Sequence, residues 1–407
     1  MLNRNKRIAV QLMIGPQQVN ELGKELILRK LDYVLNALCP NDLMLSISAE
    51  FTELANQVVE KCEKKGTSVY RWTMVFADRP ASLSSHVPLA KDSKGNDGYG
   101  SLGVWKRIGK GDEKFLFHCP ASLGQDEQGI QWAIDSAINI GAHGIFLDRI
   151  RFPSPANGLE FLGACACPLC REAYKNSTDK DWVDLSSLLI NCAKLGSNGA
   201  AVYMEQAKPM LVFRSHVIEL LVAKYAHAAH ENRLRVGLDL FAPSIAFLVG
   251  QDYHLLSEHA DFIKPMFYCK TYAPAGLPLE FGLLTKGLEQ AGVEKRMAYS
   301  FVSELFSIET NILDDIMEKK GIPSSFARRE IQKCMQEIDR DMQAMPYVYA
   351  GIELVDHSSY DTMIDDATRD SYLESLIDYD IAVCWNILYV PERHIEAISA
   401  RWKDQNG

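Results

Sequence analysis

Short apolar runs alternate with longer amphipathic stretches along this chain, and this alternation is its most regular feature. The short runs have the length and composition of buried strands, whereas the stretches between them space their apolar residues as helices do. Amphipathic helical stretches cover 19–38 and 210–230, while the run 297–302 fits either a strand or a helix. The expected strands are residues 7–14, 43–48, 68–76, 144–147, 235–241, 261–267, 347–355 and 381–388.

Buried strands that alternate with helices pair in parallel through right-handed crossovers. Eight of them favour an α/β fold, a (β/α)8 barrel, with an open doubly wound sheet as the alternative. No Gly-x-Gly-x-x-Gly or Walker A pattern follows the first strand, which weakens the nucleotide-binding interpretation. The 407 residues fit one barrel domain, 1–407, that carries long insertions. These insertions are expected at 78–118, after the third strand, and at 153–230, after the fourth.

Composition excludes several classes of protein. The formal net charge of -10 argues against nucleic acid as a partner, because a phosphate-binding surface needs a basic excess. The apolar run at 8–14 is too short for a membrane span and lacks a cleavage site. Ten cysteines without a secretory signal indicate a reducing compartment, so we expect a cytoplasmic protein. The oligomeric state stays open, a homo-oligomer included.

A compact cysteine cluster follows the fourth strand. Cys165, Cys167 and Cys170 lie close together in the sequence, and a structural zinc site takes four tetrahedral ligands. Cys119 is the best candidate for the fourth, because it precedes the helix that leads into that strand. Packed free thiols and an iron–sulfur cluster are the alternatives, although the spacing lacks the usual cluster run. Four thiolates would leave no open position for a catalytic water, so the Zn²⁺ is expected to be structural. The remaining cysteines are interpreted as core residues: Cys39, Cys62, Cys192, Cys269, Cys334 and Cys384.

Around this cluster the chain resembles the family 42 β-galactosidases. The segments 118–122, HCPAS, and 165–170, CACPLC, are similar to the four-cysteine zinc site of that family. There, one cysteine precedes the fourth barrel strand and a Cys-x-Cys-x-x-Cys follows it. The segment 146–153, FLDRIRFP, also resembles the DYIRFP strand of uncharacterised glycoside-hydrolase-like barrel proteins. The resemblance implies a glycoside-hydrolase-like barrel over roughly residues 5–400.

The fourth strand departs from the galactosidase pattern. In that family it ends in Asp-Asn-Glu, and the Glu is the general acid/base. Here Asp148 is followed by Arg149 and Ile150, so the galactosidase acid/base has no counterpart.

Three acids lie at the predicted carboxyl ends of strands, where a barrel enzyme builds its site: Asp148, Asp239 and Glu353. Glycoside hydrolysis needs two carboxyl groups, one to donate a proton and one to attack the sugar or activate water. We expect Asp148 and Glu353 to form this pair, with Glu353 as the nucleophile. Asp239 could instead partner Asp148. The structural alternative is that Asp148 makes a salt bridge with Arg149 or Arg151 and that Glu353 faces a polar loop.

Other residues are candidates for contacting a sugar. Aromatic side chains stack on sugar faces, although an aromatic residue in a strand more often belongs to the core. Lys264 interrupts an otherwise apolar strand, and a buried lysine needs a carboxylate partner. It is therefore a site residue, half of a structural ion pair, or the Schiff-base lysine of an aldolase. The substrate-binding candidates are Trp385, Asn386, Tyr268, Lys264, Arg149, Arg151 and Trp72, while His118, His143 and His357 could serve in acid–base chemistry.

The sequence thus predicts a glycoside hydrolase that acts on a small glycoside or oligosaccharide. A carbohydrate-binding protein that has lost catalysis is the alternative from another class. A lysine enzyme of the aldolase type is a third hypothesis, and it requires a depressed pKa for Lys264.

Overall fold

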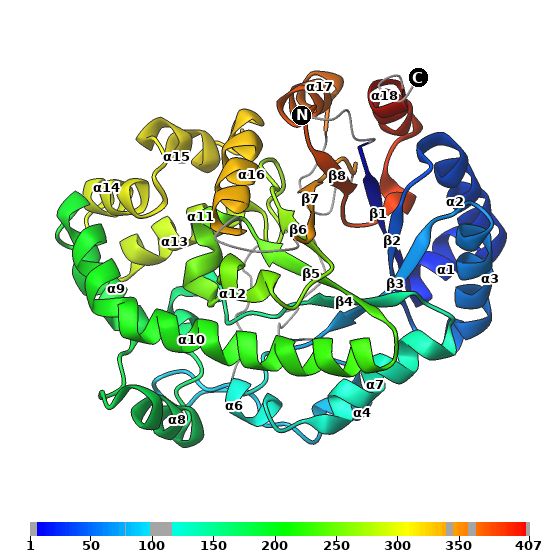
Figure 1. Cartoon of the computed structure of the whole chain (residues 1–407). Helices are drawn as coiled ribbons and strands as arrows, with labels where there is room; N and C mark the ends of the chain where they lie inside the picture. Colours follow the sequence, from blue (N-terminus) through cyan, green and yellow to red (C-terminus); the bar gives the residue numbers. More distant parts are fainter. Residues whose placement is uncertain (1–5, 78, 98–115, 339–344, 357–363, 404–407) are drawn as a thin grey trace.

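The fold is that of a closed barrel, seen in a computed structural model that describes residues 6–77, 79–97, 116–338, 345–356 and 364–403. Eight strands pair in parallel in the order of the sequence, and the eighth closes onto the first (Figure 1). This confirms the (β/α)8 prediction over the open sheet. The strands are β1 Ile8–Ile14, β2 Asp42–Ile47, β3 Ser68–Met74, β4 Gly144–Asp148, β5 Arg235–Phe241, β6 Phe262–Met266, β7 Tyr347–Ile352 and β8 Asp380–Val383.

Helices surround the barrel, and additional helices lie in the segments that follow β3, β4 and β6 (Figure 1). Within the described ranges, no helix has both the length and the apolar character needed to cross a membrane. The α-helices are α1 Pro16–Leu22, α2 Lys24–Leu38, α3 Thr52–Glu63, α4 Ala81–Ser84, α6 Pro120–Leu123, α7 Glu127–Asn139, α8 Pro168–Thr178, α9 Leu185–Ala193, α10 Ser197–Glu231, α11 Pro243–Ala246, α12 Tyr253–Ser257, α13 Leu277–Gln290, α14 Lys295–Phe306, α15 Thr310–Met317, α16 Ser325–Ile338, α17 Asp366–Ser375 and α18 Glu392–Lys403.

Several sequence-based expectations are corrected. The stretch 19–38 is divided into α1 and α2 at Gly23, whose φ of 73° suits glycine and interrupts the helix. The ambiguous run 297–302 is helical and lies within α14. The helix predicted at 210–230 begins earlier, at Ser197, and continues through Pro209. Cys39 is exposed rather than part of the core, because it follows the last turn of α2 in a left-handed conformation.

The strand register sorts the interior of the barrel into an aromatic layer and a polar layer. Paired residues of neighbouring parallel strands point to the same face, so every second residue of each strand faces the interior. Tyr70, Phe146 and Tyr349 surround the ring of Phe262, with ring centroids 4.8 to 5.7 Å from its own. Gly237 gives this ring its space, since a Cβ there would lie 2.1 Å from it. Toward the carboxyl ends, interior positions become polar.

Candidate active site and metal centre

A buried ion pair occupies the interior of the barrel at the level of β5 and β6. Asp239 and Lys264 are paired in the register, and Lys264 Nζ lies 2.8 Å from Asp239 Oδ1. Their side chains are 3% and 0% exposed, so both charges are removed from water. The carboxylate partner that a buried lysine requires is therefore Asp239.

Gln11 belongs to this cluster, although sequence reasoning missed it as a site residue. It lies in β1 and is 1% exposed. Its Nε2 donates to Asp239 Oδ2 at 3.4 Å, and its Oε1 accepts from the backbone N–H of Trp385 at 2.9 Å and from Lys264 Nζ at 3.4 Å. The signal for it was present, because Gln11 is a lone polar residue in an apolar strand, as Lys264 is.

Asp148 ends β4, where the sequence placed it, and lies beside Asp239. The register pairs Leu147 with Leu238, so the next step brings the two aspartates together on the interior face. Neighbouring strands are about 5 Å apart, which is the separation expected for their Cα atoms. The carboxylate of Asp148 accepts from Trp72 Nε1 at 2.9 Å and from the backbone N–H of Arg149 at 2.5 Å. Trp72 therefore orients Asp148.

Burial changes the protonation of all three charged groups. Desolvation raises the pKa of Asp239 to about 7, an increase that Lys264 opposes and the charge of Asp148 supports. Desolvation also raises the pKa of Asp148, while the N–H donors of Trp72 and Arg149 oppose the rise. Burial alone would lower the pKa of Lys264, but the charge of Asp239 raises it above its ordinary value. The lysine is therefore held as an ammonium ion.

Aromatic side chains lie around the ion pair. Lys264 Nζ donates to the hydroxyl of Tyr268 at 3.0 Å, and the Tyr268 ring meets Trp385 edge to face at a centroid distance of 6.2 Å. Trp385 is partly exposed, whereas Tyr268 is 2% exposed. Trp385 and Arg149 both have left-handed backbones, with φ of 74° and 55°. Such conformations in non-glycine residues often mark functional sites, and here Arg149 directly follows β4 while Trp385 lies two residues beyond β8.

Glu353 has a different environment from the two aspartates. Its side chain is 0% exposed, and its Oε1 accepts the backbone N–H groups of Lys270 at 2.7 Å and Thr271 at 3.2 Å. The hydroxyl of Tyr372 donates to it at 3.1 Å. Desolvation raises the pKa of Glu353 to about 7. The carboxylate is thus engaged in holding the loop that follows β6.

The Glu353 environment predicts a distinctive dependence of stability on pH. The folded pKa of about 7 exceeds the ordinary 4.5, so folding is favoured by protonation of this group. Its contribution is fully present below about pH 4.5 and is lost as the pH rises through about 7, a change of about 3 kcal/mol. Glu353→Gln keeps the one oxygen needed to accept both backbone N–H groups, cannot ionise, and should lack this pH-dependent loss. Denaturant unfolding of wild type and Glu353→Gln between pH 4.5 and 8 measures the difference. The same dependence of unfolding free energy on pH in both proteins would contradict the raised pKa of Glu353.

Removing the acceptor altogether should have a larger effect. Glu353→Ala leaves two backbone N–H groups unpaired, so its free energy of unfolding should fall by roughly 3 kcal/mol or more relative to Glu353→Gln.

Several other predicted site residues make structural contacts. Arg151 Nη1 donates to Asn157 Oδ1 at 3.2 Å, and the guanidinium lies over the ring of Phe241. Asn386 bonds both backbone groups of Met13 and so ties β1 to the loop after β8. His118 and His143 bond backbone groups through Nδ1, and His357 lies outside the described residues.

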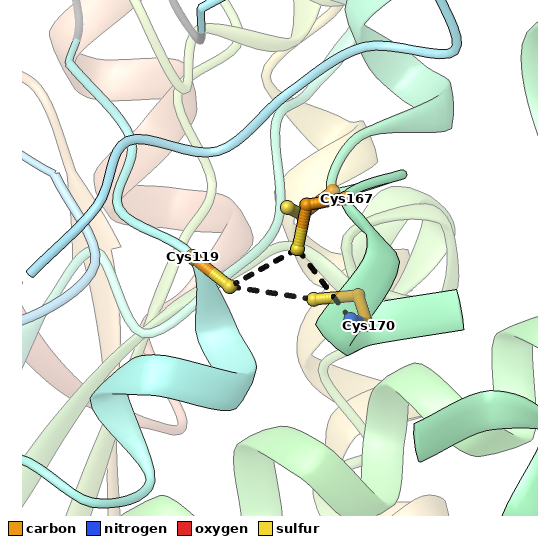
Figure 2. A group of neighbouring side chains, drawn as sticks. Cys119, Cys167 and Cys170 are labelled. Atoms are coloured by element: carbon orange, nitrogen blue, oxygen red, sulfur yellow. Dashed lines mark hydrogen bonds between the residues drawn. The ribbon is translucent and has the colours of Figure 1, made fainter. Parts of the chain in front are cut away.

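The four predicted metal ligands come together. Cys119 precedes α6, Cys165 and Cys167 precede α8, and Cys170 lies in its first turn; Figure 2 shows three of these side chains converging. The four sulfur atoms all lie within 4.8 Å of one another. Cys119 Sγ is 3.6 Å from Cys167 Sγ and 3.5 Å from Cys170 Sγ.

This geometry fits a tetrahedral ion. Ligand sulfurs 2.3 Å from a central zinc would lie about 3.8 Å apart, close to the spacings found. Backbone N–H groups also point at the sulfurs, from Lys91 to Cys165 and from Cys170 to Cys167, both at 3.4 Å. Such donors stabilise thiolates. The four cysteines could therefore hold a metal ion.

Comparison with known proteins finds only remote similarities, all among solved structures. No family model matches the sequence, and no curated protein matches it. Among solved structures, the PgaB (BpsB) glycoside hydrolase domain from Bordetella bronchiseptica is 12% identical with a TM-score of 0.48, covering 97% of this chain and 98% of that one. A chitinase from Chromobacterium violaceum ATCC 12472 is 8% identical with a TM-score of 0.40, covering 98% of this chain and 99% of that one. These values carry no activity over to this chain.

Proposed function

We propose that this protein hydrolyses the O-glycosidic bond of a small glycoside or oligosaccharide at the carboxyl end of its barrel. The observation that carries the proposal is the pair of aspartates, Asp148 and Asp239, on neighbouring strands beside the buried ammonium of Lys264. Two carboxyl groups at this end of a barrel are what glycoside hydrolysis requires.

The charges and hydrogen bonds around the two aspartates support different catalytic roles for them. One ammonium and two carboxyl groups that share a single proton have no net charge, which suits a buried site. Asp148 accepts two N–H donors, which stabilise its ionised form, while Asp239 has a pKa near 7. In the reactive form the shared proton is assigned to Asp239, and the ionised Asp148 then balances the charge of Lys264. Asp239 is thus the proton donor to the leaving oxygen, and Asp148 is the carboxylate that faces the sugar carbon.

The spacing of the strands supports a retaining reaction. The backbones of adjacent strands lie about 5 Å apart, so carboxyl groups at one level can approach to the about 5–5.5 Å of retaining enzymes, whereas inverting enzymes need about 6.5–9.5 Å to admit water. Asp148 would then attack the sugar carbon as the leaving oxygen takes the proton of Asp239. Water would release the sugar in the second step, returning a proton to Asp239.

The remaining candidates support this site from around it. The partly exposed Trp385 offers a stacking surface for a sugar, and Trp72 and Tyr268 position the charged groups. Glu353 is assigned to holding the β6 loop instead of to the reaction, since its acceptors are already engaged.

Two alternatives make different predictions. A lysine enzyme needs an amine of lowered pKa, but the pKa of Lys264 is raised by Asp239. A carbohydrate-binding protein would bind oligosaccharides without cleaving them. A panel of aryl glycosides and free oligosaccharides separates the hypotheses: release of the aryl group supports a glycosidase, while binding without turnover on any sugar would replace it with the binding protein.

Replacing Lys264 is expected to change how the hydrolytic activity depends on pH. Asp239 must carry its proton to act as the acid, so activity should fall as the pH rises through about 7. The charge of Lys264 lowers the pKa of Asp239, so Lys264→Met should move this alkaline limb upward by about 1 pH unit or more. Lys270→Met is the matched control, because Lys270 lies on the loop beyond β6, and its profile should not move. A limb that stays in place or moves down in Lys264→Met would contradict the assignment of Asp239.

The ion of the four-cysteine site is proposed to be Zn²⁺ in a structural role. Four sulfur ligands in tetrahedral arrangement suit zinc and complete its coordination. None of the ten cysteines forms a disulfide, which supports the proposal that the protein is located in a reducing compartment such as the cytoplasm.

A further inference from the structure

We propose that Arg214 is the buried counter-charge of the four-cysteine metal centre and that it holds this centre against the loops of the barrel mouth. The inference rests on the proposed metal. Arg214 lies in α10, a long helix that packs against β5 and also against α6 and α8, the helices beside the four cysteines (Figure 1).

The guanidinium of Arg214 donates hydrogen bonds to the segment that leads into the cysteine cluster. The residue is 1% exposed, and its Nη2 donates to the carbonyl oxygens of Leu162 at 2.5 Å and Ala164 at 2.6 Å. Ala164 immediately precedes Cys165. The position of the first CxCxxC ligand therefore depends on this arginine.

Arg214 carries a buried positive charge without a carboxylate partner. Among the described residues, no Asp or Glu lies within ion-pair distance of it, and its guanidinium donates to the neutral carbonyl oxygens of Leu162, Ala164 and Leu248. A buried charge is costly unless another charge compensates it. Burial lowers the pKa of Arg214 to about 10, and Tyr203, the thiols of Cys165 and Cys170, and Asp184 oppose this decrease.

Metal binding would supply the missing charge. Each of the four thiols gives up its proton to solvent when it binds, so one Zn²⁺ and four thiolates carry a net charge of −2. Lys91 and Arg171 are described cations that also lie near the cluster, since the Lys91 backbone N–H donates to Cys165 and Arg171 directly follows Cys170. The ammonium of Lys91 is paired with Asp97 at 2.9 Å, and Arg171 is exposed. Of these three described cations, Arg214 is thus the buried one, next to the segment that enters the centre.

The same side chain also contacts segments that follow the catalytic strands. Its guanidinium lies 4.6 Å from the ring centroid of Phe152, shortly after Asp148 and β4. Its Nη1 donates at 3.2 Å to the carbonyl oxygen of Leu248, which follows β5. Arg214 therefore joins the metal centre to both loops that flank the two aspartates.

The test is a cycle that combines metal removal with replacement of the charge. Arg214→Met removes the charge at similar length, and Arg214→Lys keeps the charge but loses the fork of donors. Arg71→Met is the matched control, because Arg71 is also buried and donates to the carbonyl oxygens of Leu45 and Ile47, away from any cysteine of the centre. Zinc stoichiometry and affinity are measured against a competing chelator, with thermal unfolding of the metal-loaded and metal-free forms.

Wild type should bind one zinc per chain, and failure to bind would refute the metal proposal itself. If zinc binds, Arg214→Met should weaken its affinity about 10- to 100-fold, Arg214→Lys less, and Arg71→Met not at all. Arg214→Met should also destabilise the metal-loaded form more than the metal-free form, because only the former provides the negative charge. Equal destabilisation of both forms, or unchanged zinc affinity, would overturn the role of Arg214. If Arg214→Met does not fold, Arg214→Lys provides the test. A decrease in zinc affinity of more than 100-fold in Arg214→Lys would overturn the role of the charge, because this variant retains it.

Discussion

Replacing Asp148 with Asn is expected to lower kcat for glycoside hydrolysis by about 10³-fold or more with little change in substrate binding. The substitution keeps the shape of the side chain, and its amide oxygen can still accept the N–H of Trp72. It removes the negative charge that attacks the sugar carbon, an interaction made in the transition state, so kcat and kcat/KM should fall together. Asp239→Asn should have a comparable effect through loss of the proton donor, for which about 10²–10⁴-fold is typical.

A third buried aspartate provides the control for these variants. Asp42 lies at the opposite, amino-terminal end of the barrel, where it is 2% exposed and pairs with Arg7 at 2.8 Å. Asp42→Asn should reduce stability but leave kcat within a few-fold of wild type, because conserved function in this fold is built at the other end. Steady-state kinetics at temperatures where all variants are folded make the comparison. Activity in Asp148→Asn at the level of Asp42→Asn would remove Asp148 from the reaction.

Replacing Cys170 with Ser is expected to abolish stoichiometric zinc binding and to destabilise the protein strongly. Cys170 is buried and its sulfur lies 3.5 Å from that of Cys119, so a hydroxyl there leaves three thiolates around the ion. With free zinc about 1,000-fold above its dissociation constant, the bound ion contributes about 4 kcal/mol to the free energy of unfolding, which the variant should lose. Cys62→Ser is the control, since Cys62 is a buried thiol of α3 outside the cluster. Metal analysis and denaturant unfolding, with and without chelator, provide the readout; full zinc occupancy in Cys170→Ser would contradict the four-ligand site.

Local signals explain which parts of the molecule could be predicted. The strands were found because each is a short apolar run, and Asp148 because it directly follows one of them. The three clustered cysteines were visible in a single segment, and Cys119 followed from its place before the same strand. These features depend on residues close together in the chain.

Features that depend on distant partners could not be found in this way. Glu353 had the right place for a nucleophile, but its bonds to Lys270 and Thr271 join residues more than 80 positions apart. Gln11 and Arg214 act through carbonyl, amide and charged groups that only the closed barrel and the packing of α10 bring near. A polar residue in an apolar strand, as Gln11 is, should be weighed as a site candidate even when it carries no charge.

The most direct test of the account is to find where a mechanism-based label attaches. A 2-deoxy-2-fluoro glycoside of whichever sugar is turned over slows release of the covalent intermediate in a retaining enzyme, so that the labelled peptide can be identified by mass spectrometry. Asp148 should carry one label per chain in the wild type, and Asp148→Asn should carry none. A label on Glu353, or rapid turnover without any covalent label, would contradict it.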